Sequence, residues 1–312
     1  MDCNQPAVDL HIHTTASDGT FSPVEVLYHA EKIGLKAISI TDHDTVSGVI
    51  EAQNSGISKR IGFLTGVEIS ADMAPVFEAA ESCHILGYCI DPENPYLIQI
   101  LRKLGDARKN RNPQIIEKLR ALNFDITLED VLSHSVQDQV GRPQIAEWLV
   151  KRNFVTSINE AFDKYLSRGR PAYVDKYRIS SAEAIRLIRI SGGIPVLAHP
   201  FLIHPDNPAV LENMIPVLKD MGLMGIEVFY SGHSPDMTDF LADIARRNNL
   251  LMTGGTDFHG TLTPDIQMGK GKGDLVVPYE IYEKLAAACR MCRGLPERSR
   301  RLTGNRWKAP QA

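Results

Sequence analysis

Short runs of apolar, β-branched residues recur along this chain and alternate with helical patterns. Each run is too short for a helix, and most are bounded by Gly, Pro or Asp. The runs are Val8–Ile12, Ala37–Ile40, Phe63–Ile69, His84–Tyr88, Ile194–Ala198, Gly225–Phe229 and Leu250–Gly254. We interpret them as buried, mostly parallel strands. Repeated strand-then-helix alternation predicts an α/β fold, either a doubly wound sheet or a (β/α) barrel.

The alternation is interrupted between about residues 95 and 173, where strand patterns are missing and amphipathic helical patterns dominate. We therefore expect a discontinuous barrel over residues 1–95 and 173–290, with a helical insertion over residues 96–172. A basic C-terminal tail is expected over residues 291–312. Helix starts are marked on the barrel side as well, because Ser22 and Ser180 each precede a glutamate by three residues, as in a capping box.

The first part of the insertion is basic. Asp106 and Glu117 are the acidic residues of the stretch 102–120, and its basic residues are Arg102, Lys103, Arg108, Lys109, Arg111, Lys118 and Arg120. A solvated helix face and a site for a phosphate-bearing ligand both explain this pattern. For the basic C-terminal tail we favour a solvated segment over one that binds RNA.

Composition excludes several other classes of protein. The 312 residues are 43% hydrophobic and carry a formal net charge of −4, which excludes a disordered or fibrous chain. The cysteines, Cys3, Cys83, Cys89, Cys289 and Cys292, are odd in number and scattered, so we expect no disulfide framework and a reducing compartment. We expect a cytoplasmic protein without a membrane segment, because the chain contains neither a signal-peptide pattern nor a long apolar run.

Histidines and carboxylates follow most of the predicted strands. The side chains in question are His11, His13, Asp18, His43, Glu68, His199, Asp257 and His259. Because the carboxyl ends of parallel strands share one edge, these groups should converge at one mouth. His84 begins its strand instead, so it reaches that mouth only if the strand runs antiparallel or starts earlier.

Such a concentration of imidazoles and carboxylates predicts a metal centre. His11 and His13 are two residues apart in a strand and therefore face the same side. The set exceeds the ligands of one tetrahedral ion, so we expect two or three divalent ions. Imidazole mixed with carboxylate favours Mn²⁺, our first expectation, or Fe²⁺ or Zn²⁺, over Ca²⁺ or Mg²⁺.

The motifs that carry these residues resemble those of the polymerase and histidinol phosphatase (PHP) family. They are Asp9–His13, Thr41–Asp44, Gly66–Glu68, Ala198–Pro200 and Thr256–His259. The resemblance implies a distorted (β/α)7 barrel with two or three metal ions. It also implies three ligand sets: His11, His13, Glu68 and Asp257; Glu68, His84 and His199; and Asp18, His43 and His259. Because every ligand position is filled, the metal-free versions of this domain are a poor match.

Within the family, the insertion and the stretch 106–111 resemble the bacterial branch that removes phosphate from nucleoside 3′,5′-bisphosphates or trims short RNA from its 5′ end. By that resemblance the substrate contacts are Arg108, Lys109, Asn110, Arg111 and Arg142, together with Asp18, His43 and His233. Guanidinium groups suit phosphate oxygens. Related sequences often carry His where this chain has Gln144, which leaves base and ribose contacts open.

The expected reaction is hydrolysis of the 3′-phosphate, for example of adenosine 3′,5′-bisphosphate to AMP, by a hydroxide that bridges two ions. We assign catalytic roles to His199, Asp257 and His233, and His233 is equally well explained as a hydrogen-bonded loop residue. Asp44 is expected to cap the helix that follows it, and Asp42 to orient a ligand imidazole.

Three alternative functions are retained. These are a 5′→3′ exonuclease on short single-stranded RNA, a histidinol phosphatase and a non-catalytic metal-binding module. A nucleotide is the expected partner, and no feature of the sequence indicates an obligate protein partner.

Overall fold

The computed structural model describes residues 8–73, 83–133, 140–203, 207–293 of the chain. Seven strands follow one another around a twisted sheet, in the order β1-β2-β3-β4-β6-β7-β8, and a short strand, β5, pairs with β3. The strands are β1 (Val8–Ile12), β2 (Ala37–Ile40), β3 (Gly62–Asp72), β4 (Cys83–Tyr88), β5 (Ile179–Ser180), β6 (Ile194–Leu197), β7 (Gly225–Tyr230) and β8 (Leu251–Gly255).

The sheet closes almost completely into a barrel. Past the end of β8, the Asp257 amide donates to the His11 carbonyl at 2.9 Å, and the His13 amide donates to the Phe258 carbonyl at 2.9 Å. This close approach requires Gly255, because a side chain there would collide with His11. The α/β class and the distorted (β/α)7 barrel are therefore confirmed.

The strands are parallel except around β4, which is antiparallel to both β3 and β6. The predicted runs match β1 and β2 residue for residue and the other main strands to within a few residues, whereas the two-residue β5 was not predicted. Antiparallel β4 supplies the condition under which His84 reaches the mouth of the barrel.

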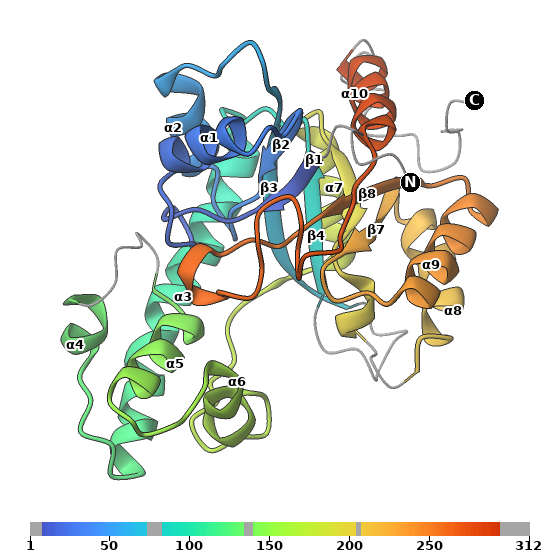
Figure 1. The fold of residues 1–312 in the computed structure, drawn as a ribbon. Coiled ribbons are helices and arrows are strands. Elements are labelled where there is room, and N and C mark those ends of the chain that lie inside the picture. The colour runs from blue at the N-terminus through green and yellow to red at the C-terminus, as the bar shows by residue number, and fades with distance from the viewer. Residues whose placement is uncertain (1–7, 74–82, 134–139, 204–206, 294–312) are drawn as a thin grey trace.

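Helices cover the outside of the barrel and form a separate lobe beneath it (Figure 1). The barrel helices are α1 (Pro23–Lys32), α2 (Ser47–Ser55), α7 (Ser181–Ile190), α8 (Val210–Asp220), α9 (Pro235–Arg247) and α10 (Tyr279–Arg293). The capping box at Ser22 is present, since Ser22 Oγ accepts from the Glu25 amide and Glu25 Oε2 accepts from the Ser22 amide. Ser180 caps α7 in the predicted place.

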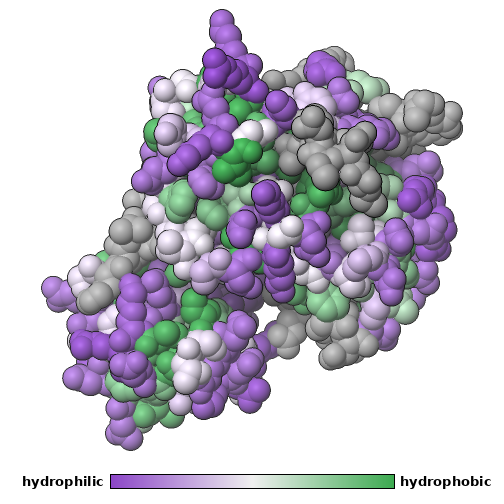
Figure 2. Space-filling model, in the orientation of Figure 1, coloured by the Kyte–Doolittle hydropathy of each residue, from purple (hydrophilic) through white to green (hydrophobic). Residues whose placement is uncertain are grey.

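The lobe consists of α3 (Pro95–Ala121), α4 (Leu128–Ser133), α5 (Arg142–Lys151), α6 (Ile158–Ala161) and a short π-helix at Phe162–Leu166. The first half of α3, with Leu97, Leu101 and Leu104, packs in the barrel core. Its second half, from Ile115 onward, packs with α4 to α6 in a core of their own. The change of packing partner thus lies inside α3. In the space-filling view the lobe surface is mostly hydrophilic, with apolar side chains on part of the viewed face (Figure 2).

The cysteines differ from expectation. Cys89, which follows β4, forms a disulfide with Cys289 of α10, 200 residues away in the sequence. The expectation that the scattered cysteines form no disulfide framework was therefore wrong for this pair, because the fold brings together two residues that are distant in the sequence. Most of the predicted C-terminal tail lies outside the described residues. Among the helices that are described, none has the length and apolar character needed to cross a bilayer.

Candidate metal centre

The ends of the barrel strands bring every predicted ligand to one place. His11 lies within β1 and His13 just after it, Glu68 lies in β3, and the loops after β2, β6 and β8 carry His43, His199 and the Asp257–His259 pair. His84 joins them from the start of β4, where it pairs in register with Ser70 of β3.

Three groups of these side chains have ligand atoms that lie within 4.8 Å of one another. The first group is His11, His13, Glu68 and Asp257, the second is His43, Glu68 and His84, and the third is His13, Asp18, His43 and His259. His199 is joined to the second group, because its Nε2 lies 2.9 Å from Glu68 Oε1. The first group equals the first ligand set implied by the resemblance, whereas the second group contains His43 beside Glu68 and His84, and the third contains His13 in addition.

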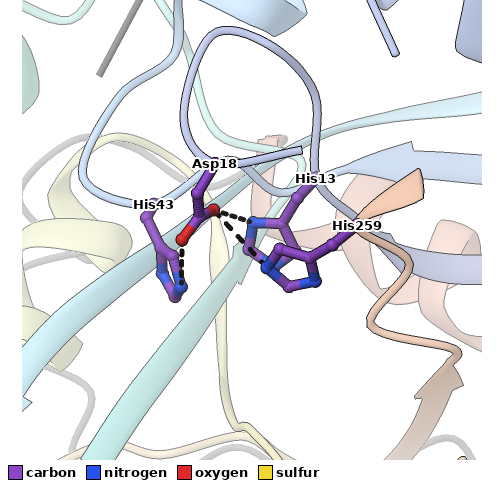
Figure 3. Close-up of side chains that lie close together, drawn as sticks. All are labelled: His13, Asp18, His43 and His259. Carbon is purple, nitrogen blue, oxygen red and sulfur yellow. Dashed lines mark ion pairs between the residues drawn. The ribbon is translucent and has the colours of Figure 1, made fainter. Parts of the chain in front are cut away.

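The third group shows how one carboxylate can be shared (Figure 3). Asp18 lies between His43 on one side and His13 and His259 on the other. Its Oδ1 lies 3.4 Å from His259 Nε2 and 3.6 Å from His13 Nδ1, and its Oδ2 lies 3.8 Å from His43 Nε2. These distances are long for direct ion pairs and leave the nitrogen and oxygen atoms facing a common point.

The chemistry of the donor set fits divalent ions. Several buried atoms in the groups lack a partner with hydrogen-bond geometry: His11 Nε2, His13 Nε2, Asp18 Oδ1, His43 Nδ1 and Glu68 Oε2. Buried polar atoms are normally satisfied, and such a concentration of unsatisfied ones in a single cluster calls for a ligand. Imidazole nitrogens and carboxylate oxygens together are the donors that Mn²⁺, Fe²⁺ and Zn²⁺ accept.

The carboxylates of the cluster are held in their charged form. Burial would raise the pKa of Glu68, but the charges of His43, His84 and His11 hold it well below its ordinary value. Burial would also raise the pKa of Asp18, but the charges of His43 and His259 hold it well below its ordinary value. The charges of His11 and His259 do the same for the pKa of Asp257. The centre therefore offers anionic oxygens to a cation at neutral pH.

Two of the predicted ligands lie in strained backbone. His199 has φ of 26° and Asp257 has φ of 57°, in the left-handed region that side-chain-bearing residues avoid. The surroundings hold both in place, since the His199 amide donates to Glu227 Oε2 at 2.7 Å and the Asp257 amide donates to His11. Strain concentrated at these positions is typical of functional loops.

Glu227 of β7 was missed by the sequence analysis. Its Oε1 accepts a hydrogen bond from His11 Nδ1 at 2.9 Å, and its Oε2 holds the His199 backbone, so one fully buried carboxylate orients two predicted ligands. The available signal was a single acidic residue inside an otherwise apolar strand. A carboxylate behind a ligand imidazole fixes its tautomer and orientation.

Replacing Glu227 by glutamine should weaken metal binding. The amide can still fill the space, but its single oxygen cannot accept from both His11 Nδ1 and the His199 amide, so we expect a loss of about 10–100-fold in metal affinity. Titration of the metal-depleted protein with Mn²⁺ in a calorimeter measures this. Exposed Glu183 on α7 provides the matched control, Glu183→Gln. Wild-type affinity in the Glu227 variant would contradict the assigned role.

The two aspartates beside His43 differ in outcome. Asp42 accepts from Ser17 Oγ at 2.6 Å and from Thr14, and Ser17 Oγ in turn lies 3.5 Å from His13 Nδ1, so Asp42 reaches a ligand imidazole only indirectly. The prediction that Asp44 caps the next helix was wrong. Helix α2 begins at Ser47 without a side-chain cap, and Asp44 instead accepts from Ser70 and from two cations of the insertion side.

His233 lies beside the metal centre without joining it. Its Nδ1 donates to the Val228 carbonyl at 2.9 Å, and its Nε2 is buried without a hydrogen-bond partner. Tyr230, also missed by the sequence analysis, lies between them: its ring centroid is 5.1 Å from that of His233, and its hydroxyl donates to Asp257 Oδ2 at 3.3 Å.

A group of buried and half-buried cations adjoins the centre. It consists of Arg108 and Arg111 of α3, Arg142 of α5, and Lys176 and Arg178 of the segment that returns to the barrel, the last two missed by the sequence analysis. Burial and repulsion by Arg108, Arg142 and Arg178 lower the pKa of Arg111 to about 9. The structure places Lys109 and Asn110 on the exposed side of α3, apart from this group.

Comparison with known proteins agrees with the motifs. The family model of the PHP domain matches residues 9–194. A 5′-3′ exoribonuclease of Haemophilus influenzae is 31% identical over 88% of this chain and 98% of its own length. A 3′,5′-nucleoside bisphosphate phosphatase of Chromobacterium violaceum is 31% identical over 81% of this chain and 87% of its own.

Among solved structures, a proposed metal-dependent phosphoesterase from Bifidobacterium adolescentis superposes with a TM-score of 0.79 at 30% identity, over 93% of this chain and 97% of that one. The likeness thus extends through the insertion and is not confined to the metal-centre motifs. With the motifs, the barrel and the family model in agreement, the chain belongs to the PHP domain family.

Proposed function

We propose that this chain is a metal-dependent phosphoesterase that removes the 3′-phosphate of nucleoside 3′,5′-bisphosphates. The observation that carries the proposal is a pair of cations next to the metal centre, buried Arg111 and half-buried Arg142, that have no paired carboxylate. Among the described residues, neither Arg111 nor Arg142 forms an ion pair with a carboxylate. Leaving guanidinium groups buried and unpaired is costly, and a phosphate group would relieve that cost.

The insertion orients one of these cations before any substrate arrives. The Arg142 guanidinium carbon lies 5.6 Å from the ring centroids of both Phe162 and Tyr173, and its Nη1 donates to the Leu166 carbonyl at 3.1 Å. A guanidinium group held in one orientation in this way suits a phosphate that is bound but not cleaved. We therefore assign Arg108, Arg111 and Arg142 to the phosphate that is not cleaved.

The side chains of the metal centre are assigned to the phosphate that is cleaved. His11, His13, Asp18, His43, Glu68, His84, His199, Asp257 and His259 would hold two or three divalent ions, with Mn²⁺ proposed ahead of Fe²⁺ and Zn²⁺. When bound, such ions supply Lewis acidity toward the phosphate and lower the pKa of water. Asp18, His43 and their neighbours then lie where the transferred group must sit.

His233 is proposed to serve the leaving oxygen. Burial lowers the pKa of His233, so the ring is neutral at rest, and its free Nε2 accepts a proton only when an anionic phosphate lies beside it. The ribose 3′-oxygen departs with negative charge, and a proton held at Nε2 would neutralise it. His199 and Asp257 keep the catalytic roles assigned above, as residues that fix the centre around the reacting phosphate.

A second function is favoured by a different observation. The outward side of α3 carries exposed cations, among them Arg102, Lys103 and Lys109, outside the enclosed group around Arg111. A longer ligand such as 5′-phosphorylated RNA would use them, and a relative of similar identity is named as a 5′-3′ exoribonuclease. The cytoplasm remains our proposed compartment, although the Cys89–Cys289 disulfide removes the argument from the cysteines for it.

A direct comparison of substrates tests the proposal. With Mn²⁺ supplied, we expect kcat/KM for phosphate release from adenosine 3′,5′-bisphosphate to exceed the value for nucleotide release from a 5′-phosphorylated tetraribonucleotide. AMP, which lacks the 3′-phosphate, and histidinol phosphate are the controls and should release little phosphate. The reverse order of the two main substrates would make the chain an exoribonuclease, and no turnover of either would overturn both functions.

A further inference from the structure

Two hydrogen bonds join the insertion side to the loops that carry the third metal group, which consists of His13, Asp18, His43 and His259. Arg108 Nη2 of α3 donates to Asp44 Oδ2 at 3.0 Å, and Asp44 is the residue next to His43. Gln144 Nε2 of α5 donates to the Asp18 carbonyl at 3.3 Å. The Arg108 contact is thus made next to His43, and the Gln144 contact is made to Asp18 itself.

Asp44 forms hydrogen bonds both with the barrel and with residues of the insertion side. Its amide donates to the Glu68 carbonyl at 2.9 Å, and its carboxylate accepts from the Ser70 amide at 2.8 Å and from Ser70 Oγ at 2.9 Å. Lys176 Nζ donates to the same carboxylate at 2.9 Å. Only 1% of Asp44 is exposed, and its φ of 54° is one that an aspartate rarely adopts. Such a residue is held by its contacts, so changing them should move the loop that carries His43.

The cation that holds Asp44 also belongs to the proposed phosphate pocket. Arg108 lies one helical turn before Arg111, and both are buried on the same side of α3. A phosphate placed between Arg111 and Arg142 would attract Arg108 as well, so Arg108 is shared between substrate and Asp44. Gln144 lies two residues after Arg142 in the first turn of α5, and its Oε1 accepts from the Gly141 amide at 2.8 Å. Both contacts therefore start from residues that a bound phosphate would reposition.

We propose that Asp44 and Gln144 are positioning residues that couple nucleotide binding in the insertion to ion binding in the third metal group. The inference rests on the proposed function, because it takes the nucleotide phosphate as the ligand of the arginine pocket. Coupling of this kind is reciprocal: a nucleotide that raises the affinity for the ion must itself bind more tightly when the ion is present. The third ion would then be bound firmly only when a substrate is in place.

Calorimetric titration of the metal-depleted protein with Mn²⁺, with and without saturating AMP, measures the coupling. AMP is the product of the proposed reaction and retains the 5′-phosphate. We expect AMP to tighten one Mn²⁺-binding step by about 5–150-fold, the range typical of coupled sites. The variant His259→Ala, which lacks a ligand of the third group, should lose that step and so identify it.

The variants separate coupling from a merely structural role. Asp44→Asn removes the negative charge and leaves one acceptor oxygen, which cannot serve both the Ser70 amide and the cations Arg108 and Lys176. In Gln144→Ala the contact with Asp18 is lost. In both we expect the AMP effect to fall below about twofold while the other Mn²⁺ steps stay as in the wild type. Asp175→Asn is the matched control, because Asp175 pairs with Arg178 at 2.7 Å but does not contact the third group.

Each result decides between the proposals. AMP that binds without changing any Mn²⁺ step, or an unchanged AMP effect in both variants, overturns the coupling. If Asp44→Asn does not fold, Gln144→Ala decides alone, since it removes a single hydrogen bond. If AMP does not bind at all, the coupling is overturned. Phosphate release from adenosine 3′,5′-bisphosphate is then measured separately: release supports the proposed function, and no release overturns it as well.

Discussion

Replacing Glu68 by glutamine is expected to reduce kcat for phosphate release by at least roughly a thousandfold. Glu68 is the carboxylate that the first two metal groups share, with Oε1 2.9 Å from His199 and 3.0 Å from His84, and Oε2 2.9 Å from His43. A glutamine offers one acceptor oxygen in place of two and carries no charge. Losing about 4 kcal/mol of metal-dependent stabilisation of the transition state corresponds to about that factor in rate.

Metal analysis by mass spectrometry should show the cause, because the Glu68→Gln protein is expected to retain fewer ions than the wild type after dialysis. The matched control is Glu280→Gln on α10, where the exposed glutamate pairs with Lys284 and lies far from the barrel mouth in sequence and fold. A Glu68→Gln protein that keeps both its full metal content and more than about a tenth of wild-type kcat would refute the shared-ligand assignment.

The barrel and most of the metal centre were predictable because they depend on local patterns. β1 and β2 are apolar and β-branched, and their C-terminal positions are set by the chain direction alone. His11, His13, His43 and Asp257 follow from that direction. His84 did not follow from it, because a local pattern does not reveal that β4 runs antiparallel between β3 and β6. In that case the family resemblance supplied what the strand pattern lacked.

The supporting residues depend on long-range contacts and were not predicted. Glu227 reaches His11 across 216 residues of sequence, and Lys176 reaches Asp44 across 132. No pattern in the sequence around Glu227 or Lys176 predicts its partner. The same holds for the Cys89–Cys289 disulfide. For Asp44 the local pattern gave a wrong prediction. Its position before a helix predicted a helix cap, but in the structure its carboxylate pairs with Arg108 and Lys176.

Within the insertion, helical periodicity decides which basic residues face inward. Arg108 and Arg111 are one turn apart and buried, whereas Lys109 and Asn110 between them are exposed. A contiguous motif such as 108–111 cannot therefore act as one unit on a helix. The proposed pocket therefore keeps Arg108 and Arg111 of this stretch, together with Arg142 of α5, whereas the neighbouring Lys176 and Arg178 are paired with Asp44 and Asp175.

Replacing Arg111 by alanine is expected to raise KM for adenosine 3′,5′-bisphosphate by roughly 10–100-fold. A hydrogen bond from a charged donor contributes about 1.5–3 kcal/mol, and each 1.4 kcal/mol is about tenfold in affinity. If Arg111 grips the phosphate that is not cleaved, its contact is the same in ground and transition states, so kcat should change by less than about threefold. Initial rates over a range of substrate concentrations separate the two constants.

The unliganded protein should tolerate the same substitution, which distinguishes a binding residue from a structural one. Arg111 is buried beside Arg108 and Arg142, whose repulsion helps to lower its pKa, so removing it relieves repulsion and the melting temperature should not fall. Arg111→Lys should recover only part of the lost affinity, because an ammonium cannot grip two phosphate oxygens as a guanidinium fork does. Lys109→Ala, two residues earlier and exposed, is the control and should leave KM unchanged. Wild-type KM and kcat in Arg111→Ala would remove Arg111 from the pocket, and a fall confined to kcat would move its contact to the phosphate that is cleaved.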